Sequence, residues 1–119
     1  MNMAVQYKEA TGAAVEWITV STTGDLPNGS RRILEIDGLP VAVFNIAGHY
    51  YAIADVCSHN DGPVAEGDLL EYDIECPRHG ARFDVRSGKV LSFPAIVDIP
   101  AYPVRVEGDE IQIALPAGE

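Results

Sequence analysis

Two short segments of the chain each combine a cysteine with a histidine, and both residue types are common metal ligands. The first is Cys57-Ser58-His59 and the second is Cys76-Pro77-Arg78-His79. Sixteen residues, 60–75, separate them. In each segment the thiol and the imidazole are close enough along the chain to reach one metal centre from a single tight loop. We call these segments the first and the second knuckle.

Three kinds of chemistry are compatible with mixed knuckles. A disulfide between Cys57 and Cys76, the only cysteines, requires an oxidising compartment and leaves the histidines unexplained. A structural zinc site takes two cysteines and two histidines, but zinc fingers usually place the cysteines in one knuckle and the histidines in the other. A [2Fe–2S] cluster with two histidines on one iron suits mixed knuckles, because each loop then supplies one ligand to each iron.

The pattern Cys57-x-His59, sixteen residues, then Cys76-x-x-His79-Gly80 resembles the Rieske motif, and the resemblance extends over residues 17–115. Further matches surround the knuckles, namely Gly62-Pro63, Gly67, Phe83-Asp84 and Ser87-Gly88. Ser92-Phe93-Pro94-Ala95 resembles the family's third, proline-containing loop. The resemblance implies one [2Fe–2S] cluster per chain. Cys57 and Cys76 would bind the inner iron, and His59 and His79 would bind the outer iron near solvent.

The resemblance also implies an all-β fold of three small antiparallel sheets with the cluster at one tip. Short apolar or alternating segments predict strands at residues 15–20, 31–36, 41–46, 49–54, 104–107 and 110–115. Turns are predicted at Asp37-Gly38-Leu39-Pro40 and Ala47-Gly48, and a type II′ hairpin at Gly108-Asp109. We expect a single domain over residues 1–119. A loop-rich cluster-binding subdomain, about residues 56–95, interrupts a β base formed by residues 15–55 and 96–115.

Two residues beside the second knuckle predict a low reduction potential. High-potential relatives from respiratory complexes resemble this loop but carry a serine where this chain has Ala81 and a tyrosine where it has Phe83. Those hydroxyls donate hydrogen bonds to cluster sulfurs, and such relatives also have a second cysteine pair that this chain lacks. Acidic residues near the knuckles oppose an added electron as well, namely Asp55, Asp61, Glu66, Asp68 and Asp84. The expected potential is about −150 mV, at the low end of the Rieske range.

The composition limits the partners of the chain. Eight lysines and arginines stand against eighteen aspartates and glutamates, which gives a net charge of −10. Phosphate groups would repel such a chain, so we expect no nucleic-acid partner, whereas basic protein surfaces would attract it. No apolar run is long enough to span a membrane, and residues 1–14 lack the apolar stretch of a secretory signal. We therefore expect no membrane partner and a cytoplasmic location.

The expected function is electron transfer and not catalysis. Outside the knuckles only His49 remains, and we interpret it as a structural or surface residue, so no second iron site of the two-histidine, one-carboxylate type is visible. The chain resembles the ferredoxin of aromatic-ring-hydroxylating dioxygenase systems, which carries one electron from a flavin-dependent reductase to a terminal oxygenase. The expected exit is formed by His59 and His79, surrounded by Pro63, Arg78, Phe93 and Pro94. Two alternatives stay open: a small subunit of an assimilatory nitrite reductase, and a redox- or iron-sensing module.

Overall fold

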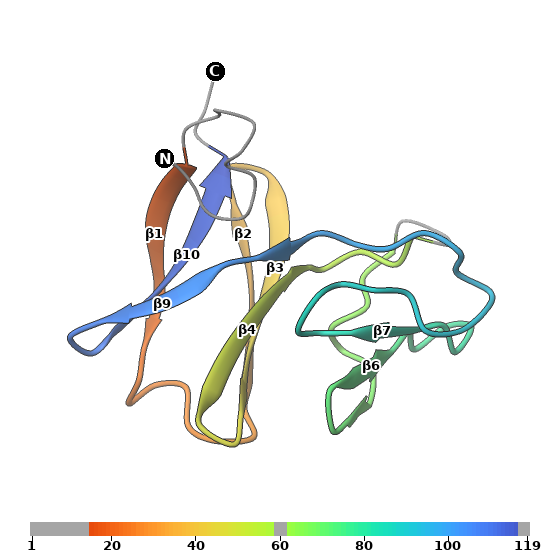
Figure 1. The fold of residues 1–119 in the computed structure, drawn as a ribbon, viewed down its shortest axis with the longest axis horizontal. Coiled ribbons are helices and arrows are strands. Elements are labelled where there is room, and N and C mark those ends of the chain that lie inside the picture. Colours follow the sequence, from red (N-terminus) through yellow and green to blue (C-terminus); the bar gives the residue numbers. More distant parts are fainter. Residues whose placement is uncertain (1–14, 59–61, 117–119) are drawn as a thin grey trace.

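The computed structural model describes residues 15–58 and 62–116, in which ten strands form three antiparallel sheets (Figure 1). The first sheet has the order β1–β10–β9 and the second has the order β2–β3–β4–β8. The third sheet has the order β5–β6–β7. The structure thus confirms the expected all-β fold of three small antiparallel sheets. Among the described residues, no helix could cross a lipid bilayer.

The first sheet consists of β1 (Val15–Thr22), β9 (Val104–Glu107) and β10 (Glu110–Pro116). As the alternating pattern predicted, Ile111, Ile113 and Leu115 of β10 are buried. Strands β9 and β10 are joined by the predicted two-residue turn, because Glu107 pairs with Glu110. Of the two turn residues, only Gly108 has a positive φ, 66°, which is the pattern of a type II′ turn.

The second sheet consists of β2 (Arg31–Ile36), β3 (Leu39–Ile46), β4 (His49–Ala54) and β8 (Ala101–Tyr102). The predicted strand at 41–46 begins two residues earlier. The turn before it needs only Asp37 and Gly38, whose φ values of 51° and 84° close a two-residue hairpin. Leu39 and Pro40, which were predicted as turn residues, therefore pair with Ile36 and Glu35 of β2.

The third sheet consists of β5 (Leu69–Leu70), β6 (Asp73–Glu75) and β7 (Arg82–Asp84). The residue pattern alone predicted only loops in this part of the chain, because strands of two or three residues are too short to show a period. In Figure 1 this sheet lies to one side of the other two. The chain that leaves β4 is paired with the chain that returns to β8, since the Ala54 N–H donates to the Pro100 carbonyl at 2.9 Å.

Two groups of buried side chains fill the molecule. The base core lies between the first two sheets and contains Val20, Leu26, Val41, Val43, Ala52, Ile111, Ile113 and Leu115. The knuckle core contains Ala42, Phe44, Ile53, Cys57, Val64, Ala65, Ile74, Cys76, Ala81, Phe83, Val85, Ala95 and Ile99. Alternate residues of β3 contribute to the two cores, so one face of the second sheet packs in the base core and the other face packs in the knuckle core. The subdomain boundaries at residues 56 and 95 stay a prediction.

Candidate metal centre

Each knuckle is closed by a backbone hydrogen bond of the same type. The Cys57 N–H donates to the Gly62 carbonyl at 2.6 Å, and the Cys76 N–H donates to the Ala81 carbonyl at 2.7 Å. Each bond links a cysteine to the residue five positions later. In the second knuckle the Gly80 N–H also donates to the Cys76 carbonyl, and Gly80 has a φ of 81°, which favours glycine. The backbone therefore fixes each cysteine at the start of a tight loop.

The thiols and the imidazole of the knuckles lie in different surroundings. Cys57 and Cys76 are both buried in the knuckle core, with exposed fractions of 0% and 2%. His79 is exposed, as are Pro77 and Arg78 beside it. His59, the fourth predicted ligand, lies outside the described residues. Two buried thiols with an imidazole at the surface fit a cluster whose cysteine side is inside and whose histidine side faces solvent.

The described residues do not by themselves form a site for a single metal ion. No group of three or more His, Cys, Asp or Glu side chains within residues 15–58 and 62–116 could hold one. The predicted set of four ligands includes His59, so this result leaves the ligand assignment a prediction.

A polar hollow of about 510 Å³ lies beside the second knuckle. Its lining is Glu66, Gly67, Asp68, Glu75, Cys76, Pro77, Arg78, His79 and Gly80. Three carboxylates therefore face the same space as the exposed imidazole. One of them, Glu75, also lies 3.6 Å from the Arg82 guanidinium. The hollow provides a negatively charged surface directly beside His79.

The proline-containing loop forms an apolar surface near the first knuckle. Phe93 is 81% exposed and Ile96 is 73% exposed, beside a groove of about 320 Å³. The loop is tied to its surroundings at two points. The Ser58 hydroxyl donates to the Val97 carbonyl, and the Arg82 N–H donates to the Ser92 hydroxyl at 3.1 Å. The loop is thus held against the first knuckle.

The residues that were predicted around the electron exit are exposed or half-buried in the structure. Pro63, Arg78 and Phe93 are exposed, and Pro94 is half-buried. Two further exposed apolar residues, Ile96 and Val97, extend this surface and were not identified from the sequence. The signal that could have found them is the apolar pair itself, which follows the predicted loop directly.

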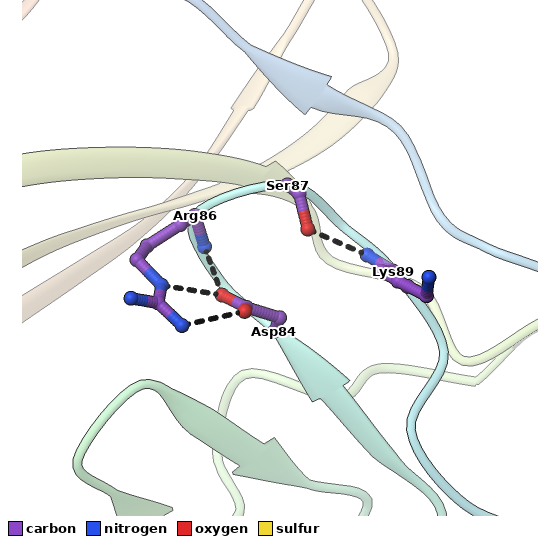
Figure 2. A network of polar contacts seen from close by, with 4 residues as sticks. All are labelled: Asp84, Arg86, Ser87 and Lys89. Atoms are coloured by element: carbon purple, nitrogen blue, oxygen red, sulfur yellow. Dashed lines mark hydrogen bonds and ion pairs between the residues drawn. The ribbon is translucent and has the colours of Figure 1, made fainter.

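The acidic residues predicted around the cluster differ in how their charges are balanced. Figure 2 shows that Asp84 accepts three hydrogen bonds from Arg86: from the backbone N–H at 2.8 Å, from Nε at 3.0 Å and from Nη2 at 2.9 Å. The side-chain bonds to Arg86 hold the pKa of Asp84 below its usual value, although partial burial acts in the opposite direction. Glu66 and Asp68 line the hollow beside His79, and Asp61 lies outside the described residues.

The segment from Asp84 to Lys89 forms a tight turn that explains the Ser87-Gly88 match. The Gly88 N–H donates to the Asp84 carbonyl at 2.6 Å, and the Lys89 N–H donates to the Ser87 hydroxyl (Figure 2). Gly88 has a φ of 78°, and a Cβ there would lie 1.9 Å from the Ile99 carbonyl oxygen. Glycine is therefore required at this position. The turn holds the returning chain against the third sheet.

Arg86 also connects the third sheet to the second. Its guanidinium carbon lies 4.1 Å from the centre of the Tyr72 ring. The Tyr72 ring packs edge to face with the ring of Tyr51 on β4, with ring centres 5.9 Å apart. Such cation–π and edge-to-face contacts contribute modestly to stability. They link the knuckle region to the base on the side of the molecule that carries β4.

The structural roles of two charged residues near the knuckles were not predicted from the sequence. Asp55 was predicted only as part of an acidic surround, and Arg31 was predicted only as a strand residue. In the structure, Asp55 is buried and accepts hydrogen bonds from the Val64 and Ala65 N–H groups. The Arg31 guanidinium donates to the Ala65 and Gly67 carbonyls. Both side chains thus bind the backbone between the knuckles.

Comparison with known protein families decides between the three chemistries. Residues 16–103 match the Rieske [2Fe-2S] domain. The chain belongs to the Rieske family. This Rieske protein therefore binds one [2Fe–2S] cluster, and the disulfide and zinc alternatives are wrong. When bound, the cluster supplies one-electron redox chemistry.

Similar proteins are ferredoxins of dioxygenase systems. The ferredoxin subunit of 3-phenylpropionate/cinnamic acid dioxygenase from Escherichia coli (strain K12) is 46% identical over 98 residues, covering 80% of this chain and 90% of that protein. The ferredoxin of carbazole 1,9a-dioxygenase from Nocardioides aromaticivorans IC177 is 34% identical, with a TM-score of 0.77 over 82% of this chain and 95% of that one. A chain in the complex of reduced oxygenase and oxidized ferredoxin in carbazole 1,9a-dioxygenase is 32% identical, with a TM-score of 0.78 and coverages of 87% and 97%.

The two residues that the sequence predicts to lower the potential of this Rieske protein lie in the knuckle core. Ala81 and Phe83 are both fully buried, in the same core as Cys57 and Cys76. Hydroxyl groups introduced there would be shielded from water, and an introduced hydrogen bond to a cysteine sulfur would favour the reduced state.

We expect Phe83→Tyr to raise the reduction potential. A hydrogen bond to a charged group contributes about 1.5–3 kcal/mol, and about 1–2 kcal/mol of it differs between the oxidation states. The expected rise is therefore roughly 40–85 mV, since about 59 mV corresponds to a tenfold change for one electron. Ala81→Ser should act in the same direction. Protein-film voltammetry measures both.

A crystal structure of the Phe83→Tyr variant is the necessary companion measurement. If the new hydroxyl lies within hydrogen-bond distance of a cysteine sulfur while the potential stays within about 10 mV of the parent, the hydrogen-bond explanation is wrong. The acidic residues would then be the better explanation of a low potential.

Proposed function

We propose that this Rieske protein is the ferredoxin component of an aromatic-ring-hydroxylating dioxygenase system. It accepts one electron from a flavin-dependent ferredoxin reductase and delivers it to a terminal oxygenase. The ferredoxin subunit that is 46% identical supports this role over a nitrite reductase subunit or a sensor. A cytoplasmic location is part of the proposal, because a reducing compartment keeps Cys57 and Cys76 as thiols rather than as a disulfide.

One observation carries the proposal: the imidazole of the second knuckle is exposed while both thiols are buried. An electron therefore leaves most directly through the histidine side. His79 lines the acidic hollow, and Phe93 and Ile96 supply an exposed apolar surface on the loop that is held against the first knuckle. Apolar contact with a charged rim is the usual composition of a docking site between proteins that meet transiently.

Within this proposal, Cys57, His59, Cys76 and His79 are the four ligands of the cluster. We expect His79→Ala to lose most of the cluster, because removal of one ligand opens an iron to solvent. His49→Ala is the matched control, since His49 is exposed at the start of β4, and this variant should retain a parental spectrum. Iron content and the electron paramagnetic resonance of the reduced protein measure both. A His79→Ala protein with an unchanged average g-value would rule out His79 as a ligand.

The direct test of the function is stepwise electron transfer. The purified protein is mixed anaerobically with NADH and catalytic amounts of a flavin-dependent ferredoxin reductase, and reduction is followed by the loss of visible absorbance. A terminal oxygenase, an aromatic substrate and oxygen are then added, and the absorbance should return. If the cluster is reduced chemically but not by such reductases, the shuttle role is wrong.

We also expect electron transfer from a basic partner to slow as salt rises. The net charge of −10 steers a basic surface toward the protein, and the Debye length falls to about 8 Å at 0.15 M salt. The rate measured by stopped flow should decrease between low salt and about 0.5 M. A constant rate over this range would mean that docking is apolar and that the acidic surface serves only solubility.

A further inference from the structure

One short piece of backbone connects the two knuckles mechanically, and we call residues 62–67 the bridge segment. At its start, the Gly62 carbonyl closes the first knuckle on Cys57. At its end, Gly67 packs so tightly that a Cβ would lie 1.6 Å from the carbonyl oxygen of Glu75, the residue before Cys76. A displacement of the bridge segment would therefore move both knuckles.

An anion from the base holds the N–H side of the bridge segment. Asp55 is only 6% exposed, and its Oδ1 accepts hydrogen bonds from the Val64 N–H at 2.8 Å and the Ala65 N–H at 2.7 Å. Its own N–H donates to the Pro40 carbonyl at 3.0 Å. Hydrogen bonds to a buried charged group are stronger than neutral ones. Asp55 thus ties the bridge segment to β3.

A cation from the base holds the carbonyl side of the same segment. Nη1 of Arg31 donates to the Ala65 carbonyl at 2.6 Å and to the Gly67 carbonyl at 2.7 Å. The guanidinium carbon lies 5.7 Å from the centre of the Phe44 ring, which is fully buried on the neighbouring strand β3. Arg31 thus ties the bridge segment to β2.

Ala65 lies between the two charges: its N–H is bound by the anion and its carbonyl by the cation. We propose that Arg31 and Asp55 form an ion pair mediated by the bridge segment, and that this pair positions both knuckles. The two charges then act on the cluster in opposite directions, the cation favouring the added electron and the anion opposing it. The proposal depends on the cluster and on no property of the reductase or oxygenase.

The positioning part is tested by hydrogen exchange of the cluster-loaded protein, read by mass spectrometry. Arg31→Ala and Asp55→Ala should each speed exchange in the peptide that contains residues 62–67 by roughly tenfold or more, since buried hydrogen bonds are lost. In the double variant the effects should be less than additive, because the second change acts on a segment already released. Unchanged exchange in both single variants, or strictly additive effects, would overturn the mediated pair.

The electrostatic part is tested with variants that keep the shape and remove only the charge. Asp55→Asn retains an Oδ1 for both N–H groups, and Arg31→Gln retains a donor. The ratio of reduced to oxidised cluster at a fixed applied potential should rise in Asp55→Asn and fall in Arg31→Gln, each by roughly three- to tenfold. A role limited to holding the loop would not give opposite signs.

Matched controls remove the same charges elsewhere. Arg32→Gln changes the next residue of β2, which is exposed, and Asp109→Asn changes the exposed β9–β10 turn. Their ratios should stay within about twofold of the parent, since exposed charges are screened. If Asp55→Asn and Arg31→Gln shift the ratio in the same direction, or no more than these controls, the electrostatic part of the proposal is wrong. The reductase reaction plays no part in either measurement.

Discussion

Cys76→Ser is expected to abolish the visible absorbance of the cluster and to release the knuckle region from its fold. Cys76 is 2% exposed in the knuckle core, so the variant loses a predicted ligand and places a hydroxyl among apolar side chains. Metal binding and loop order are coupled when the ligands lie on loops. The base core contains no cysteine, and β1, β3 and β10 should therefore stay folded.

The expected result is a protein with two levels of protection from hydrogen exchange. Exchange should be fast at residues 62–99 and slow in β1 and β10. Ala81→Ser is the matched control, because it adds a hydroxyl to the same fully buried core without removing a ligand, and it should keep the cluster. A Cys76→Ser protein that retains iron and a parental spectrum would show that the ligand assignment is wrong.

Gly67→Ala is expected to destabilise the protein by about 3 kcal/mol or more, at the upper end of overpacking effects. The φ of Gly67 is not positive, so the reason is space alone. A Cβ would lie 1.6 Å from the Glu75 carbonyl oxygen and 3.2 Å from Cδ of Pro77. Both neighbours flank Cys76, and the backbone must move to make room. Thermal unfolding and the rate of cluster loss should both report the change.

Gly24→Ala is the control for this substitution. A Cβ at Gly24 would meet nothing within 4 Å, and this glycine also has no positive φ. Its effect should stay within about 0.5 kcal/mol, as is usual for exposed positions. Equal stability and equal cluster retention in the two variants would mean that the close approach of Gly67 to Glu75 does not exist in the protein.

Strands with a visible residue pattern could be predicted from the sequence, and very short ones could not. Ile111 and Ile113 alternate with a less buried residue, and that alternation identifies β10. Strands β5 and β8 have two residues each, which is too few for any period, and they form because the rest of the fold brings a partner alongside. Pro40 was predicted as a turn residue, but it pairs at the start of β3, where its missing N–H is tolerated.

The predicted ligands were identifiable because cluster binding requires cysteine and histidine at a fixed spacing along the chain. The roles of Arg31 and Asp55 were not identifiable in this way, because both bind backbone groups, which every residue has. Arg31 reaches carbonyls 34 and 36 residues further along the chain. One signal was available for Asp55: a carboxylate directly after the buried residues Ile53 and Ala54 must find donors nearby.

The shared closing bond of the two knuckles has a consequence for protein engineering. Because a main-chain bond runs from each cysteine to the residue five positions later, the backbone fixes how many residues each loop contains. The smallest portable unit is thus the two loops together with the chain between them, which contains the bridge segment and strands β5 and β6. A designer who transplants the centre into another β scaffold must supply an edge with one anion and one cation in the places of Asp55 and Arg31. Shortening or lengthening either loop by one residue would break the closure, whereas exposed loop side chains other than the proposed histidine ligands could be changed to suit a new redox partner.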